Sequence, residues 1–159
     1  SDTLSAITDL VNGLEEMEEP VVLVLFGDHK PWGGNGNTGY TDLGCTFDLT
    51  TTQGFYDYYA TPYLIWANSA AKEVLGNDFT GDGGDFSPCF LMEEVFTQCG
   101  WEGPGFMQLA RELPPPIHEQ GIYWKDGAPC YELTEEEQEL ISMYQNVEYY
   151  REHSVDPEQ

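Results

Sequence analysis

Residues 21–29 read Val21-Val22-Leu23-Val24-Leu25-Phe26-Gly27-Asp28-His29, an apolar run that stops at a glycine and is followed by an acid and an imidazole. A short run of β-branched and other apolar residues is typical of a strand. Strands that are apolar on both faces belong to the interior of parallel sheets covered by helices. We therefore predict an α/β fold with a mostly parallel sheet flanked by helices, and we place residues 21–26 inside that sheet.

The two residues that follow this strand form a candidate metal site. In open α/β sheets, ligands gather at the carboxyl ends of the strands. Carboxylate oxygens and imidazole nitrogens both bind metals, so Asp28 and His29 offer two adjacent donors at that position. The alternative is that Asp28 caps a turn and His29 is a surface residue, because an adjacent Asp-His pair is a common dipeptide.

The sequence around this strand predicts further elements separated by glycine-rich loops. Apolar side chains at helical spacing predict an amphipathic helix over residues 3–17. Residues 63–67 form a second short apolar run and predict another strand, whereas residues 55–60 are ambiguous between helix and strand. The remaining predictions in this part are loops over 33–44 and 76–85, a helix that Ser87-Pro88 opens and Gly100 ends, and a shorter helix over 104–113.

The C-terminal part follows three consecutive prolines and predicts a hairpin and a helix. Residues 122–124 and 128–133 flank Asp126-Gly127, a dipeptide that is typical of hairpin turns. Thr134, with Glu137 three residues later, forms a capping box, which marks the start of the last helix.

The charge of the chain excludes several partners. Its 159 residues include 5 Lys+Arg against 29 Asp+Glu, for a net charge of -24. Nucleic-acid binding needs clustered basic residues that displace counterions, and here they are scattered singly. An anionic membrane surface repels such a chain, so we expect no membrane contact by this chain itself. The 40% apolar content favours a folded domain over disorder. The abrupt helical start suggests a piece of a longer protein as much as a natural beginning, and we expect this chain itself to be soluble.

The four cysteines show no Cys-x-x-Cys spacing, which argues against a zinc site. On one helix, Cys89 and Cys99 would stand about 15 Å apart, which is too far for a disulfide. This leaves Cys45 with Cys89 and Cys99 with Cys130, or Cys45 with Cys99 and Cys89 with Cys130, or four free thiols.

Two blocks of the sequence resemble one protein family. Residues 24–31, Val-Leu-Phe-Gly-Asp-His-Lys-Pro, and residues 61–68, Thr-Pro-Tyr-Leu-Ile-Trp-Ala-Asn, resemble the C-terminal part of the lipoteichoic acid synthase and phosphoglycerol transferase family. That family belongs to the sulfatase branch of the alkaline-phosphatase-like superfamily. The resemblance covers residues 3–113. It implies that residues 1–113 are the C-terminal part of a sulfatase-like catalytic domain and that residues 114–159 are an extension packed on the same domain.

The resemblance also implies an activity for the full-length protein. The family consists of membrane-anchored enzymes at the extracellular face, which transfer glycerol phosphate from a lipid onto a polymer or glycan. They use a threonine nucleophile and a divalent metal, most typically Mn²⁺, with Mg²⁺, Zn²⁺ or Ca²⁺ as other candidates. By match to the Gly-Asp-His motif, Asp28 and His29 are two of the metal ligands. The remaining acidic ligand, the nucleophile and the main substrate-binding residues fall upstream, so we expect this chain alone to bind metal weakly or not at all and to be inactive.

The negative charge is compatible with an anionic substrate, because a bound metal inverts the local charge. Two other functions stay open. A sulfatase or phosphodiesterase of the same superfamily shares the metal site and differs in its nucleophile. A noncatalytic acidic module that binds a glycan or a protein is favoured by aromatic residues, namely Tyr56, Tyr58, Tyr59, Trp101 and Trp124. Convergence of Asp28 and His29 at the open end of the sheet favours the enzyme, and their burial in unrelated contacts favours the module.

Overall fold

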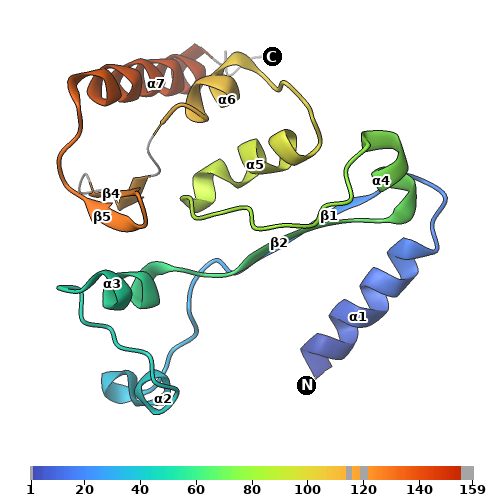
Figure 1. The fold of residues 1–159 in the computed structure, drawn as a ribbon, viewed down its shortest axis with the longest axis horizontal. Coiled ribbons are helices and arrows are strands. Elements are labelled where there is room, and N and C mark those ends of the chain that lie inside the picture. Colours follow the sequence, from blue (N-terminus) through green and yellow to red (C-terminus); the bar gives the residue numbers. More distant parts are fainter. Residues whose placement is uncertain (1, 114–115, 119–121, 155–159) are drawn as a thin grey trace.

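The chain folds into two small antiparallel sheets surrounded by helices (Figure 1). A computed structural model describes residues 2–113, 116–118 and 122–154. Helix α1 (Asp2–Glu15) leads into β1 (Val22–Phe26), and the chain returns as β2 (Tyr63–Ala67). The other elements are η1 (Asn35–Asn37), α2 (Thr38–Asp42), α3 (Thr52–Tyr59), α4 (Ser69–Leu75), η2 (Pro88–Phe90), α5 (Leu91–Gln98), α6 (Gly105–Ala110), β3 (Pro116–His118), β4 (Ile122–Lys125), β5 (Ala128–Cys130) and α7 (Glu135–Ser154).

Strands β1 and β2 form the ladder that positions the site. They run antiparallel, with Val22 opposite Ala67 at one end and Phe26 opposite Tyr63 at the other. The prediction of a mostly parallel sheet is therefore wrong for the described strands, since β3, β4 and β5 also pair antiparallel. A continuous apolar run indicates that a strand is partly covered, but it does not indicate the direction of the neighbouring strand. The mixed α and β class is confirmed.

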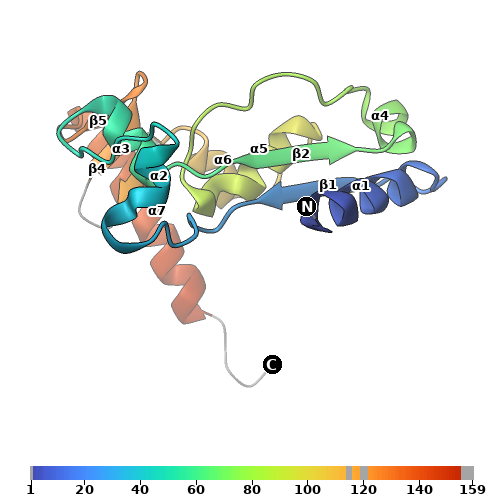
Figure 2. The ribbon, with the colours of Figure 1, turned by 90° about the horizontal axis from the view of Figure 1, so that it is seen from below.

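Asn68 closes one end of this ladder. Its side chain is fully buried, and its Oδ1 accepts hydrogen bonds from the backbone N–H groups of Val21 (3.0 Å) and Ala71 (2.9 Å). Its Nδ2 donates to three backbone carbonyls at 2.8 to 3.3 Å, those of Leu14, Met17 and Glu19. Asn68 thus caps α4 and ties that helix to the segment between α1 and β1. Figure 2 shows α1 and α4 together at this end of the ladder.

The predictions that rest on local signals agree with the structure. Helix α1, both strands of the ladder and the helix after Ser87-Pro88 lie where the pattern places them. The turn between β4 and β5 uses Asp126 and Gly127, both with positive φ, at 54° and 75°. Thr134 and Glu137 form the capping box, with N–H groups donating to Glu137 Oε2 (2.8 Å) and Thr134 Oγ1 (3.2 Å).

Two predictions needed correction or completion, and one strand was not predicted. Residues 33–44 contain η1 and α2 and are not all loop, and the ambiguous residues 55–60 lie mostly in α3. Strand β3 was not expected, because it begins at the last of three prolines. None of the described helices is long and apolar enough to cross a bilayer.

The buried core is small, and most of its side chains come from the helices. Phe90 packs edge-on against Tyr144 of α7, and the Arg151 guanidinium lies 3.6 Å from the centre of the Phe106 ring of α6. Helix α7 therefore packs on the preceding helices. The buried apolar residues are Phe55, Ala67, Ala71, Phe90, Leu91, Val95, Cys99 and Ala110.

All four cysteines are free thiols. Cys99 is buried, and burial raises the pKa of its thiol. Cys89 is exposed, and Cys45 and Cys130 are half-buried. Of the three arrangements that the spacing leaves open, the structure has the one without disulfides.

Candidate metal centre and adjoining pocket

The candidate metal centre lies at the end of the ladder opposite Asn68. The backbone N–H of Gly27 donates to the Pro62 carbonyl (3.0 Å), and the Thr61 hydroxyl donates to the Gly27 carbonyl (2.7 Å). A Cβ atom on Gly27 would lie 3.2 Å from Thr61 Cβ, so this close approach favours glycine. The turn is thereby held against the start of β2, and Asp28 and His29 follow directly after it.

Asp28 and His29 converge at this position. Asp28 Oδ2 lies 3.4 Å from His29 Nε2, and the two side chains are 77% and 76% exposed. The backbone N–H of His29 donates to Asp28 Oδ1 (2.9 Å), which holds the carboxylate beside the ring. Two donors that each lie about 2.1 Å from one ion, at octahedral to tetrahedral angles, stand about 3.0–3.4 Å apart. The observed separation fits two ligands of a single ion.

A backbone carbonyl orients the His29 ring. His29 Nδ1 lies 3.0 Å from the Lys30 carbonyl oxygen. Because a carbonyl can only accept, this hydrogen bond favours the neutral tautomer with its proton on Nδ1, in which the Nε2 lone pair is available to a metal. The Lys30 ammonium group donates to the Ala60 carbonyl, which ties this segment to the end of α3. Sequence reasoning could not identify the orienting partner, because every residue carries a carbonyl.

The donor set is incomplete within the described part of the chain. No group of three or more His, Cys, Asp or Glu side chains that could hold a metal ion occurs there. Among the described residues, Asp28 and His29 therefore stand as two candidate donors without a third. The threonines do not complete it: Thr51 caps α3 by accepting from Gly54 N–H (3.0 Å), and the Thr50 hydroxyl donates to Asp48 (2.6 Å). These two threonines are loop and cap residues.

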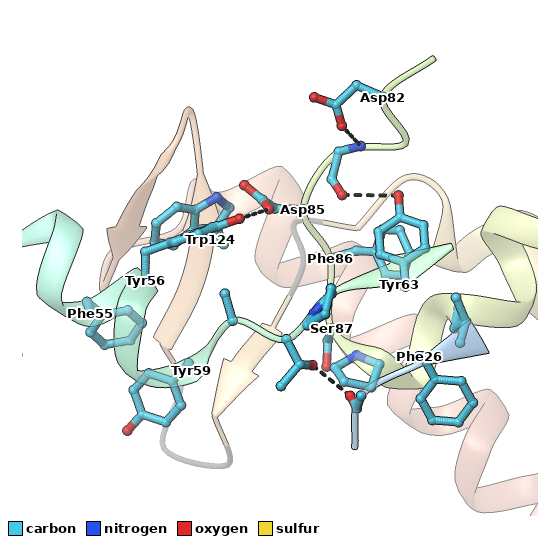
Figure 3. A pocket seen from close by; sticks show the side chains of 17 residues that line it. Phe26, Phe55, Tyr56, Tyr59, Tyr63, Asp82, Asp85, Phe86, Ser87 and Trp124 are labelled. Atoms are coloured by element: carbon cyan, nitrogen blue, oxygen red, sulfur yellow. Dashed lines mark hydrogen bonds between the residues drawn. The ribbon is translucent and has the colours of Figure 1, made fainter. Parts of the chain in front are cut away.

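A pocket of about 410 Å³ adjoins the candidate metal centre, and Gly27 is one of its lining residues. Figure 3 shows the pocket from close by. It lies between α3, the start of β2, the loop before η2 and strand β4. Its walls are mainly aromatic, and two acidic residues of the loop face it. The aromatic and acidic lining residues are Phe26, Phe55, Tyr56, Tyr59, Tyr63, Phe86, Trp124, Asp82 and Asp85.

The aromatic side chains lie in two groups. Trp124 packs with Tyr56, with ring centres 5.6 Å apart, and its ring is nearly parallel to that of the buried Phe55. Tyr63 packs on Phe86 with ring centres 4.8 Å apart. Figure 3 shows the first group on one side of the pocket and the second on the other.

Hydrogen bonds fix the tyrosines in this pocket. The Tyr56 hydroxyl donates to Asp85 Oδ1 (3.1 Å), and the Tyr63 hydroxyl donates to the Gly84 carbonyl (3.2 Å). Burial and the negative charges of Glu94, Asp82 and Asp85 raise the pKa of Tyr63 to about 12. Burial, and then Asp85, also raise the pKa of Tyr56. Both hydroxyls therefore stay protonated at neutral pH.

The aromatic residues singled out from the sequence separate in the structure. Tyr56, Tyr59 and Trp124 line the pocket. Tyr58 packs on Phe47 and Trp101 packs on Phe96, both outside its lining. Sequence reasoning did not predict that residues 76–85, which we call the acidic loop, contribute Asp82 and Asp85 to a pocket; the pattern predicted only a loop there. The signal available was acidic side chains in a glycine-rich loop, which does not by itself indicate a pocket.

One similarity to a curated protein bears on the chain. Over 101 residues it is 30% identical to a protein of Rhizobium meliloti (strain 1021) named "Putative cyclic beta-1,2-glucan modification protein". The match covers 60% of this chain but 14% of that protein, so it concerns one segment of a much longer relative. No protein-family model matches the chain, and no solved structure matches it with significance.

Proposed function

We propose that this chain is the C-terminal portion of a metal-dependent phosphoglycerol transferase with a sulfatase-like catalytic domain, in which Asp28 and His29 supply two metal ligands. The observation that carries the proposal is the convergence of Asp28 Oδ2 and His29 Nε2, 3.4 Å apart and largely exposed, beyond the carboxyl end of β1. The name of the Rhizobium meliloti relative refers to modification of a glucan, which supports a glycan as the acceptor.

The chemistry divides between the ion and the chain. A divalent metal, for which Mn²⁺ is the first candidate, supplies positive charge for a phosphodiester and lowers the pKa of an attacking hydroxyl. Asp28 contributes negative charge to the metal site, and His29 presents Nε2 while the Lys30 carbonyl holds its ring. The nucleophile and the other ligands are proposed to come from upstream sequence, together with the anchor that places the enzyme at the extracellular face of the membrane.

The ladder is compatible with a larger, mostly parallel sheet in the full-length protein. Strand β1 pairs with β2 on one edge, and its other edge has no partner among the strands that the structure describes. Phe26 and Leu64 are 58% and 50% exposed on this two-stranded ladder. Further strands would pair with the open edge, and elements packed on the ladder would cover these side chains.

A noncatalytic glycan-binding module is the second candidate, and the aromatic pocket favours it. A sulfatase or phosphodiesterase stays an alternative because it would share the same two ligands. Its nucleophile distinguishes it from the transferase, since a formylglycine derived from cysteine or serine marks a sulfatase and a threonine marks the transferase.

Titration with Mn²⁺ tests the proposed ligands. In buffer with enough salt to screen the acidic surface, calorimetry should show one weak site with a dissociation constant of about 1 mM or higher. Asp28→Asn and His29→Ala should each abolish it. The matched variants Asp9→Asn and His153→Ala, at exposed positions on α1 and α7, should leave it unchanged.

Two results would contradict this assignment. Equal Mn²⁺ binding by wild type and both ligand variants would remove Asp28 and His29 from the metal site. Turnover of a phosphodiester by this chain with Mn²⁺, lost in His29→Ala, would show that the site is complete and that the chain is not a catalytically silent part.

A further inference from the structure

We propose that the aromatic pocket beside Gly27 binds a sugar ring of a neutral glucan, with Trp124 and Tyr56 as the stacking surface and Asp85 as the acceptor of sugar hydroxyls. The pocket volume, about 410 Å³, lies within the range of small-molecule sites, roughly 300–1,000 Å³. The inference rests on the proposed function in one respect: it assigns the pocket as the subsite of the glycan acceptor.

The aromatic wall supplies the apolar half of such a site. One face of a sugar ring consists of C–H groups, which pack on the faces of aromatic rings. Trp124 is half-buried and Tyr56 is 39% exposed, so both retain surface for a ligand. Phe55 lies behind Trp124 at an angle of 19° between the rings and is 3% exposed, so the indole is supported before any ligand arrives. A preformed surface of this kind lowers the entropic cost of binding.

The acidic loop supplies the polar half. Asp85 accepts one hydrogen bond from Tyr56 through Oδ1, and Asp82 accepts one from the Gly84 N–H through Oδ1 (2.9 Å). The second oxygen of each carboxylate has no hydrogen-bond partner among the described residues and can accept from a hydroxyl. A purely apolar ligand would desolvate these carboxylates without compensation.

Charge then selects a neutral ligand over an anionic one. None of the described residues that line the pocket is Lys or Arg, whereas Asp82 and Asp85 both line it. A phosphorylated or acidic ligand would therefore be repelled within the pocket. An apolar face, several hydroxyl donors and no negative charge together describe a neutral carbohydrate.

The position of the pocket fits an acceptor subsite. Gly27 lines the pocket and immediately precedes Asp28 and His29, so a glucan bound there would lie next to the proposed metal centre. Tyr56 comes from α3, Asp85 from the acidic loop and Trp124 from the C-terminal hairpin. On this account, the extension after residue 113 contributes to the choice of acceptor.

A titration followed by NMR tests the subsite. Neutral cyclic β-1,2-glucan is added to metal-free chain with ¹⁵N-labelled tryptophan, and the indole signals of Trp32, Trp66, Trp101 and Trp124 are followed. The Trp124 signal should shift most. Trp124→Phe should weaken binding about 3- to 10-fold, whereas the control Trp101→Phe should bind as wild type does.

A charged ligand provides the second arm. The same glucan carrying glycerol phosphate groups should bind more weakly than the neutral glucan. Asp85→Asn should reduce the difference in affinity between the two glucans, because it removes one of the two carboxylate charges that line the pocket but keeps an acceptor oxygen.

The outcomes separate this proposal from the proposed function. An unshifted Trp124 signal in the wild type, or equal weakening of glucan binding by Trp101→Phe, overturns the subsite. If Trp124→Phe does not fold, the Trp124 shift in the wild type and the glucan affinity of Tyr56→Phe decide instead. Mn²⁺ binding that depends on Asp28 and His29 without glucan binding overturns the subsite alone. Glucan binding without that Mn²⁺ site overturns the transferase and leaves a glycan-binding module.

Discussion

Polar side chains are buried and fully hydrogen-bonded at one end of the β1–β2 ladder and exposed at the other. At one end, Asn68 is fully buried and its amide makes hydrogen bonds to five backbone groups. At the other end, Asp28 and His29 are more than three quarters exposed, and the hydrogen bonds of their side chains are to backbone groups of His29 and Lys30 alone. A buried polar group whose bonding is complete stabilises the fold, whereas polar groups with remaining capacity are available to a ligand.

Removing the Asn68 amide should have the largest effect on stability. Asn68→Ala leaves the N–H groups of Val21 and Ala71 and three carbonyls without this partner, so we expect a loss of about 3–4 kcal/mol in the free energy of unfolding. Urea denaturation measures it. The exposed Asn146→Ala on α7 is the control and should change stability little. A loss below about 1 kcal/mol for Asn68→Ala would show that water replaces the hydrogen bonds of the amide. Asn68 would then not hold this end of the β1–β2 ladder together.

Glu93 is a buried polar residue that contrasts with Asn68. It is 6% exposed, and its Oε2 has no hydrogen-bond partner among the residues that the structure describes. Burial raises the pKa of its carboxyl group. Because the folded state then holds the proton more tightly than the unfolded state, the stability contributed by protonated Glu93 is present below the ordinary glutamate pKa and is lost as pH rises through the folded-state pKa.

Glu93→Gln should therefore stabilise the protein by about 1 kcal/mol at pH 7. The gain should shrink as the pH falls to about 4, where wild-type Glu93 is also neutral. Denaturation of both proteins across this pH range measures the difference, and Glu139→Gln, exposed on α7, is the matched control. A gain that does not depend on pH would contradict a buried carboxylate as its source.

The residues at both ends show what the sequence could predict. Asp28 and His29 are adjacent in the chain and follow an apolar run, so their proximity after a strand follows from local pattern. Likewise, the capping box at Thr134 and the turn at Asp126-Gly127 are local signals, and the structure has both.

Features that join distant segments could not be predicted. The hydrogen bonds of the Asn68 side chain are one example, because its partners are backbone groups that lie as far as 54 residues away in the chain. The direction of pairing between β1 and β2 is not encoded in an apolar run. The pocket requires Tyr56, Asp85 and Trp124 to meet from three segments, and no spacing rule connects them.

Thr61 links the ladder to the open end and should have an intermediate effect. Thr61→Val keeps the shape of the side chain and removes the hydrogen bond to the Gly27 carbonyl, so we expect a loss of about 1 kcal/mol in the free energy of unfolding. Thr8→Val is the matched control, since the Thr8 hydroxyl donates to the Leu4 carbonyl on the exposed surface of α1. If both variants lose the same stability, Thr61 does not hold the turn before Asp28.

Asp28 and His29 should have the smallest effect on stability. Because both side chains are largely exposed, Asp28→Asn and His29→Ala should each change the free energy of unfolding by no more than about 0.5 kcal/mol. Urea denaturation without added metal measures this. A loss of 2 kcal/mol or more, roughly what a buried group costs, would mean that these residues hold the fold and are not kept for a ligand.

The location of bound Mn²⁺ decides whether Asp28 and His29 are metal ligands, because an acidic chain attracts cations at many positions. Paramagnetic Mn²⁺ at substoichiometric concentration broadens the amide signals nearest to it in the ¹⁵N-labelled chain. We predict that residues 27–30 broaden first and that His29→Ala abolishes this. Broadening centred on the acidic loop with Asp82 and Asp85, or on the glutamate-rich start of α7, and unchanged in His29→Ala, would contradict a metal site at Asp28 and His29.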